Sequence, residues 1–285
     1  MKKRNLIALF AVAFVISFVF SGVAFVQGQE KKEAARVIEE TLVVKDPTVS
    51  VPGKWVIGGA LEYWYTSGDY FKYDYSTGKK TAEGKIEGGM PGGNIFVGYG
   101  NFSLNYAYRK GSWDIDIQYL SPSMKTVETQ DQTENEFTMR YLIRVSQYLN
   151  PYFLAGYTQI DLSSTETIKT PGLVWNYNLK TVRKYDTVFK APLLGMGFIF
   201  PFHERFGIRI DGRAHYSDAE KKRDDGLKLT GNGWGYSGTA TAYVNIFKGI
   251  NLQFGGKFLK LDGGSDIGSW SKGGWFGMLG YSHKF

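Results

Sequence analysis

The sequence predicts an all-β fold, an antiparallel transmembrane β-barrel of about ten strands. The last eleven residues, 275–285, alternate between aromatic or aliphatic side chains and small or polar ones, as a strand does between lipid and a polar interior. Glycine supplies 36 of the 285 residues, nearly twice its average share, and aromatic residues reach 16%. Beyond residues 6–26 there is no long apolar run, so a membrane-bound chain of this kind has to cross as alternating strands.

The N-terminus predicts export. Lys2, Lys3 and Arg4 precede an apolar run from Leu6 to Val26, and small residues follow it, which is typical of a secretory signal peptide over 1–28. An uncleaved anchor is the alternative, because the run is long enough to span a bilayer. Cleavage would remove three bases and no acid and lower the formal charge from +7 to +4.

Composition excludes several classes of function. The chain has no cysteine, so it can form neither a disulfide framework nor a thiolate metal site. Its three histidines stand without clustered ligands, and we expect no metal and no cofactor. The mature chain is only mildly basic and has no Lys/Arg tract or nucleic-acid motif, so nucleic-acid binding is not indicated.

Residues 29–53 form a separate segment before the barrel, which we assign to 54–285. The segment is rich in charge up to Glu40 and contains Pro47 and Pro52. We interpret it as a periplasmic lead-in, which could contact a periplasmic partner.

Alternation can be followed strand by strand from Trp55. The first strand runs to Tyr65, and residues 66–90, rich in Gly, Lys and Tyr, suit a long external hairpin. A second strand covers 94–99, and Gly100-Asn101 makes a tight turn. The third strand then starts at Phe102.

The apolar set changes parity at Lys110-Gly111. Phe102, Leu104, Tyr106 and Tyr108 belong to it before the glycine, and Trp113, Ile115, Ile117 and Tyr119 after it. A slip at a glycine predicts a β-bulge within one continuing strand. A tight hairpin is the alternative, and it would change the strand count.

The later segments alternate more clearly. They predict strands over 137–145, 152–162, 174–200, 208–216, 233–246, 252–261 and 270–285. Short turns at one end and long polar loops at the other are typical of outer-membrane barrels. Aromatic residues flank the short turns and predict a periplasmic girdle of Tyr99, Phe102, Tyr148, Tyr152, Phe200, Phe206 and Phe247.

The last strand resembles the closing strand of Gram-negative outer-membrane β-barrels. In that family the terminal aromatic residue is read by the barrel assembly machinery, which implies an assembly signal at Tyr281 and Phe285. His283 departs from the pattern, since the family usually has an aromatic or aliphatic residue there. The resemblance implies a place in the cell outer membrane, in contact with outer-membrane lipid and lipopolysaccharide.

Strand parity directs a set of charged side chains toward the lumen. The set comprises Glu62, Arg109, Arg140, Arg144, Asp161, Arg209, Asp211, Arg213, Lys257 and Lys284. Unpaired charges would be costly in a narrow barrel, so we expect a salt-bridged interior that keeps the barrel rigid. Because bases outnumber acids in this set, a thin, anion-preferring, porin-like passage is the alternative.

Two constellations near the outer rim could carry catalysis. Asp114 and Asp116 share one strand face, as do Asp211 and His215, and carboxylates facing an oriented histidine could activate water. Strand order and position here resemble the omptins, ten-stranded outer-membrane endopeptidases. That family has an Asp-x-His on the seventh strand, whereas Arg213 stands where its aspartate would be.

The second constellation is Ala214-His-Tyr-Ser-Asp-Ala219. It resembles the His-x-Ser-Asn-Ala signature of outer-membrane lipid A deacylases, which implies that His215 would activate Ser217. Asp218 replaces the asparagine, and no glutamate follows at the expected distance. The sequence therefore favours a structural, surface-interaction or small porin-like role, without turnover. A rim hydrolase, omptin-like or a lipid A deacylase, is the alternative.

Overall fold

The computed structural model describes residues 46–49, 53–73, 80–120, 123–146, 148–170, 179–203, 205–247 and 249–285. The predicted signal peptide over 1–28 lies outside the described residues, as does most of the lead-in over 29–53. No helix among the described residues is long and apolar enough to cross a bilayer.

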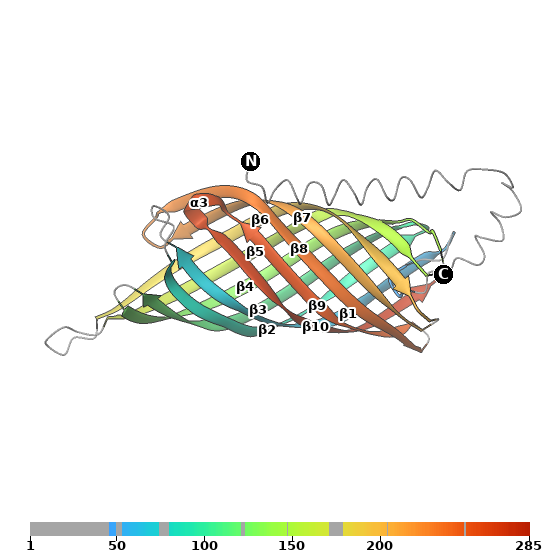
Figure 1. The fold of residues 1–285 in the computed structure, drawn as a ribbon, viewed down its shortest axis with the longest axis horizontal. Helices are drawn as coiled ribbons and strands as arrows, with labels where there is room; N and C mark the ends of the chain where they lie inside the picture. Colours follow the sequence, from blue (N-terminus) through green and yellow to red (C-terminus); the bar gives the residue numbers. More distant parts are fainter. Residues whose placement is uncertain are drawn as a thin grey trace, which may run out of the picture. The chain divides into compact units, whose positions relative to one another are not determined.

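The described residues form ten β-strands and one short helix (Figure 1). The strands are β1 (Trp55–Tyr73), β2 (Lys80–Tyr99), β3 (Phe102–Leu120), β4 (Ser123–Leu142), β5 (Asn150–Thr170), β6 (Leu179–Pro201), β7 (Phe206–Arg223), β8 (Lys228–Phe247), β9 (Ile250–Asp262) and β10 (Ser269–Lys284). The helix α3 (Gly264–Ile267) connects β9 and β10. The predicted count of about ten strands is confirmed.

The strands close into one antiparallel barrel in which each strand pairs with its neighbours in sequence. Closure joins β1 to β10, from Val56 opposite Lys284 to Ser67 opposite Gly273. The predicted turn at Gly100 is present, and its φ of 58° is a conformation that glycine adopts without steric cost. Because the strand number is even, the two ends of the barrel sequence meet at the same mouth, which we assign to the periplasmic side.

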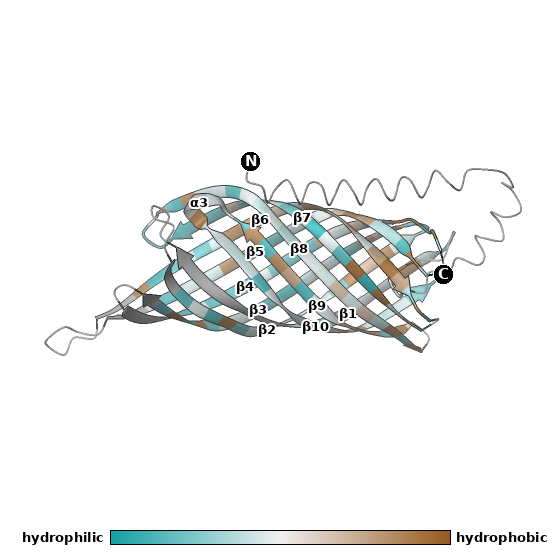
Figure 2. Ribbon diagram, viewed as in Figure 1, coloured by the Kyte–Doolittle hydropathy of each residue, from teal (hydrophilic) through white to brown (hydrophobic). Residues whose placement is uncertain are grey.

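The outer face carries an apolar belt. Leu61 on β1 and Leu194 on β6 are 74% and 70% exposed, as lipid-facing residues are in a barrel without its bilayer. The hydropathy colouring shows apolar and polar residues alternating along the strands (Figure 2). At the periplasmic edge Tyr99, Phe102 and Phe206 are exposed, as the predicted girdle requires. Tyr152 is the correction, because it is 2% exposed and points into the lumen.

A second group of exposed aromatic residues marks the other edge of the belt, where the outward residues become polar. Its members include Tyr65, Tyr108, Tyr157, Tyr216, Tyr236, Phe258 and Trp275. On β3, for example, Tyr108 is followed on the same face by Lys110 and Ser112, which are exposed. The strands therefore continue beyond the membrane on the external side.

The predicted β-bulge at Lys110-Gly111 is not present. Pairing with β4 keeps one register along all of β3, from Arg109 opposite Glu134 to Asp116 opposite Val127. Arg109 and Ile115 lie on the same inward face. The parity of the apolar residues changes because the surroundings change: lipid covers the outer face below this point, and water covers it above.

The predicted external loops are also shorter than expected. Residues 66–90, interpreted as one hairpin, are mostly strand, because β1 runs to Tyr73 and β2 begins at Lys80. Similarly, β4 begins at Ser123, whereas the sequence indicated a start near Phe137. In β2 the apolar residues Ile86 and Met90 face inward, and in β4 the inward residues before Phe137 are polar, such as Glu128 and Gln132, so neither segment has the alternation of a lipid-facing strand.

The described part of the interior contains three apolar clusters. Two lie toward the external ends of the strands: one contains Trp64, Ile86, Met90, Trp113, Ile115, Ile117 and Phe276, and the other Ile160, Leu162, Phe189, Ala191, Ala219, Leu259 and Leu261. The third lies near the periplasmic ends and contains Val49, Leu142, Tyr152, Leu154, Ile199 and Tyr243. The external part of the barrel therefore has a polar outer wall, and inside it apolar clusters lie beside buried polar residues such as Glu128 and Gln130.

Candidate functional site

A network of buried ion pairs fills the lumen between the periplasmic and external apolar clusters. Its centre is Glu134 on β4, whose side chain is fully buried. Glu134 accepts from Arg109 at 2.9 Å, from Lys257 at 2.8 Å and from Lys272 at 2.8 Å. Inside the lumen Arg109 also binds Glu62 on β1, with 2.9 Å between Nη2 and Oε2. Strands β1, β3, β4, β9 and β10 are therefore joined through one carboxylate and its partners.

The network continues toward the periplasmic side. Lys257 lies 3.3 Å from Glu136, which binds Arg213 at 2.7 Å. Arg213 in turn donates to Asp211 at 2.7 Å, and the Tyr152 hydroxyl donates to Asp211 at 3.2 Å. Tyr152 lies in the lumen because its hydroxyl finds a partner there, and the cost of burying that polar group is offset.

The lead-in contributes the lowest part of the network. Asp46 is fully buried, and its Oδ2 lies 3.0 Å from Nη1 of Arg209 on β7. Burial alone raises the pKa of the Asp46 carboxyl, but Arg209, Arg140 and the hydrogen bonds from Thr48 outweigh it and hold the pKa below its ordinary value. Nη2 of Arg209 donates to Gln253 at 3.1 Å. A residue before the first strand thus ties the lead-in into the periplasmic mouth.

Positive and negative groups are balanced among the ion pairs in the described part of the lumen. Each of the five bases contacts at least one of the five acids. The bases are Arg109, Arg209, Arg213, Lys257 and Lys272, and the acids are Asp46, Glu62, Glu134, Glu136 and Asp211. The sequence predicted more bases than acids in the lumen, and these ion pairs contain equal numbers of both. Arg140 is an additional buried cation, and it lies over the Tyr152 ring at 5.2 Å.

Sequence reasoning missed four members of the network. Glu134 and Glu136 fall in a polar stretch before the predicted start of the fourth strand, and Asp46 precedes the predicted barrel. Lys272 lies in β10 between the small residues Ser271 and Gly273, so no apolar alternation marks it as inward. One signal was available: Glu134, Glu136 and Arg140 have the same parity, so extending the strand backward would have placed both acids inside.

Two predicted lumen residues lie elsewhere. Asp161 is on the outer face of β5, between the inward Ile160 and Leu162, and Gln159 donates to it at 3.1 Å. Arg144 follows the end of β4 and binds the periplasmic turn, donating to Asn101 at 2.9 Å. The reason for Asp161 is the same inversion as in β3, since this part of β5 is surrounded by water on the outside.

The candidate catalytic residues are not brought together. Asp114 and Asp116 are exposed on the outer face of β3, and Thr129 donates to Asp114 at 2.7 Å. His215 is 1% exposed and points into the lumen, so the barrel wall separates it from both carboxylates. The carboxylate–histidine site expected from the sequence therefore does not form.

His215 and Ser217 each contact another partner. Nε2 of His215 lies 2.8 Å from the hydroxyl of Ser237 on β8. The Ser217 hydroxyl donates to the backbone carbonyl of Asp262. Both side chains are buried, and neither arrangement opens to the membrane, where a lipid substrate would have to bind.

Two small hollows lie along the described lumen. The cavity within the charged layer has a volume of about 100 Å³ and is bordered by Glu62, Arg109, Glu136 and Arg213 among others. At the external rim a hollow of about 150 Å³ is lined by Glu166, Arg183, Tyr185, Lys221, Arg223, Leu227 and Leu229. The first space holds a few water molecules at most. The second faces the external end and is rich in bases.

Solved structures provide the comparison with known proteins. The outer-membrane protease OmpT of Escherichia coli superposes with a TM-score of 0.56 at 11% identity, over 85% of this chain and 100% of that one. The two proteins therefore share the same fold. No protein-family model matches the sequence, and no curated protein matches it.

The chain has the fold of an outer-membrane β-barrel. Its ten-strand topology is omptin-like, and the apolar belt between two aromatic edges gives it its place in the outer membrane. OprG of Pseudomonas aeruginosa gives a TM-score of 0.35 at 12% identity, over 85% of this chain and 99% of that one. The transport unit of AIDA-I from Escherichia coli gives 0.37 at 9%, over 88% and 97%. At these scores both resemblances are too loose to support a common function.

Proposed function

We propose that the protein is a non-conducting outer-membrane barrel that presents a rigid β-structure at the cell surface. The observation that carries the proposal is the filled lumen. An apolar cluster with Val49 occupies the periplasmic part, the ion-pair network the middle, and two apolar clusters the external part. Ions would have to break paired, buried charges to cross, which is costly.

The external part of the barrel suits a role in surface interaction. Its outer wall is polar and includes the exposed residues Asp114, Asp116 and Asp131. Two apolar clusters join the strands on its inside, which supports their shape outside the bilayer. A hollow with Arg183, Lys221 and Arg223 opens at the external rim, and Arg223 is paired there with Asp225.

The first test of this function is conductance. Purified protein inserted into planar bilayers should show no discrete channel openings in the presence of potassium chloride. An open porin inserted under the same conditions supplies the positive control, and migration of unboiled protein on a denaturing gel verifies that the barrel is folded. Regular openings of the folded protein would show that the lumen is a pore and would refute the proposal.

We also propose that the end of β10 is read by the barrel assembly machinery. Phe285 is 62% exposed, its amide donates to the Trp55 carbonyl at 3.0 Å, and its ring packs edge-on against His283. Deleting Phe285 should lower the amount of folded protein in the outer membrane while export continues. Quantitative immunoblots of outer-membrane fractions measure this. Phe206→Ala, which removes another exposed aromatic side chain, is the control and should leave the level of folded protein unchanged. If deleting Phe285 has no larger effect than Phe206→Ala, the assembly role is refuted.

A further inference from the structure

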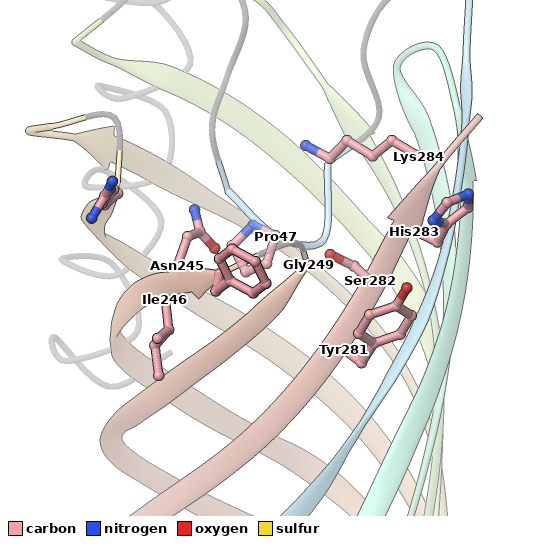
Figure 3. A pocket seen from close by; sticks show the side chains of 10 residues that line it. Pro47, Asn245, Ile246, Gly249, Tyr281, Ser282, His283 and Lys284 are labelled. Atoms are coloured by element: carbon pink, nitrogen blue, oxygen red, sulfur yellow. The ribbon is translucent and has the colours of Figure 1, made fainter.

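A large cavity opens at the periplasmic mouth, where the lead-in passes the end of the closing strand (Figure 3). Its volume is about 690 Å³, which is in the range of small-molecule sites. Pro47 borders it on one side, and the β8–β9 turn at Gly249 and the end of β10 border it on the others. In Figure 3 the Lys284 side chain extends from β10 toward the segment that contains Pro47.

The charge of this cavity is one-sided. Arg205, His283 and Lys284 line it, and the described lining residues include no acid. The nearby Asp46 carboxylate is paired with Arg209 inside the barrel and also attracts the Lys284 ammonium group, whereas Arg205 has no acid among the described lining residues. A group that fits here is therefore an anion with several acceptor oxygens, such as a phosphate.

The lower border of the cavity is apolar and faces the membrane. Ile246, Phe247 and Tyr281 line it, and each is at least half exposed on the outer face. These residues stand at the periplasmic edge of the belt, where headgroups of the inner leaflet meet acyl chains. An anion with an attached hydrocarbon chain could use both parts of the cavity.

A shallow apolar groove on the outer wall adjoins the cavity. Tyr281 also lines a hollow of about 520 Å³ formed by Gly59, Leu61, Leu279 and other residues of the seam between β1 and β10. Leu61 and Leu279 in turn border a third hollow, of about 560 Å³, that extends to β8 and β9. In a membrane this groove is covered by acyl chains, because water is absent there.

We propose that the closure seam binds one glycerophospholipid of the periplasmic leaflet, with its phosphate in the basic cavity and an acyl chain in the groove. Arg205 and Lys284 hold the phosphate, and the groove receives the chain where glycine leaves room. Gly277 shows this directly, since a Cβ atom built there meets no atom within 4 Å. The bound lipid would cover the joint between the first and last strands.

Native mass spectrometry of the full, detergent-purified barrel tests the headgroup part. Dioleoylphosphatidylglycerol and dioleoylphosphatidylcholine carry identical chains, so their difference reports the anionic headgroup. We expect the unmodified barrel to retain one phosphatidylglycerol with several-fold preference. The double variant Arg205→Gln/Lys284→Gln should lose that preference. A control with the same loss of charge at the external end, Lys184→Gln/Lys228→Gln, should keep it.

A second pair of variants tests the groove. Gly277→Leu adds a side chain into the groove at a position where its Cβ meets no protein atom, so it should lower occupancy by both lipids several-fold. Gly212→Leu on β7 is its control, because a Cβ there also meets nothing within 4 Å and lies away from the seam. Equal lipid retention by these two variants, or by the two charge variants, would overturn the proposal. A site for free phosphate alone would respond to the charge variants and not to Gly277→Leu, and that result too would overturn it.

Discussion

Replacing Glu134 with glutamine should lower the free energy of unfolding by about 3–5 kcal/mol, the usual cost of removing one partner from a buried ion pair. Glutamine keeps the shape of the side chain and removes its charge. Arg109, Lys257 and Lys272, all within 3 Å of the carboxylate, would then remain buried with fewer partners. Urea titration of the barrel folded into lipid vesicles, followed by tryptophan fluorescence, measures the change.

The matched control for Glu134 is Asp131→Asn on the same strand. Asp131 is exposed on the outer face, so the same change of carboxylate to amide should shift stability by less than about 0.5 kcal/mol. Equal effects of the two substitutions would show that the lumen network does not stabilise the barrel. A larger loss for Glu134→Gln together with new channel openings in planar bilayers would show that the network also closes the lumen.

Much of the fold could be predicted because lipid imposes a simple rule on one face of each strand. The terminal strand, the count of about ten and the turn at Gly100 all follow from alternation and glycine. The rule applies only within the bilayer. Above it, residues such as Trp113 and Ile160 turn inward, and the same rule then misplaces Asp161 and suggests a bulge in β3.

The lumen site was harder to predict, because the acids that balance it lie in stretches without the lipid pattern. Arg109, Arg213 and Lys257 were placed inside by parity alone. Their partner Glu134 lies in a polar segment that reads as a loop, and Asp46 precedes the barrel altogether. One clue was available in the sequence: the predicted lumen residues include more bases than acids, and a narrow lumen cannot hold such an excess without further acids nearby.

In the external part of β3 the apolar side chains face inward, the reverse of the lipid-facing part. Substitutions at two neighbouring residues of β3 can test this. Ile115 is fully buried in the external apolar cluster, and Asp116 is exposed on the opposite face. Ile115→Asp should destabilise the barrel by more than about 4 kcal/mol, because it buries a carboxylate without a partner. The external strands should also become sensitive to protease added to intact cells.

Asp116→Ile is the complementary substitution, and it should have little effect. The isoleucine would stand in water on a strand, where β-branched residues are well accommodated, so stability should change by less than about 0.5 kcal/mol. A β-bulge at Lys110-Gly111 predicts the reverse order, because it would turn Ile115 toward the outside and Asp116 toward the lumen. Urea titration of the two variants side by side therefore decides between a continuous strand whose surroundings change and a strand whose register slips.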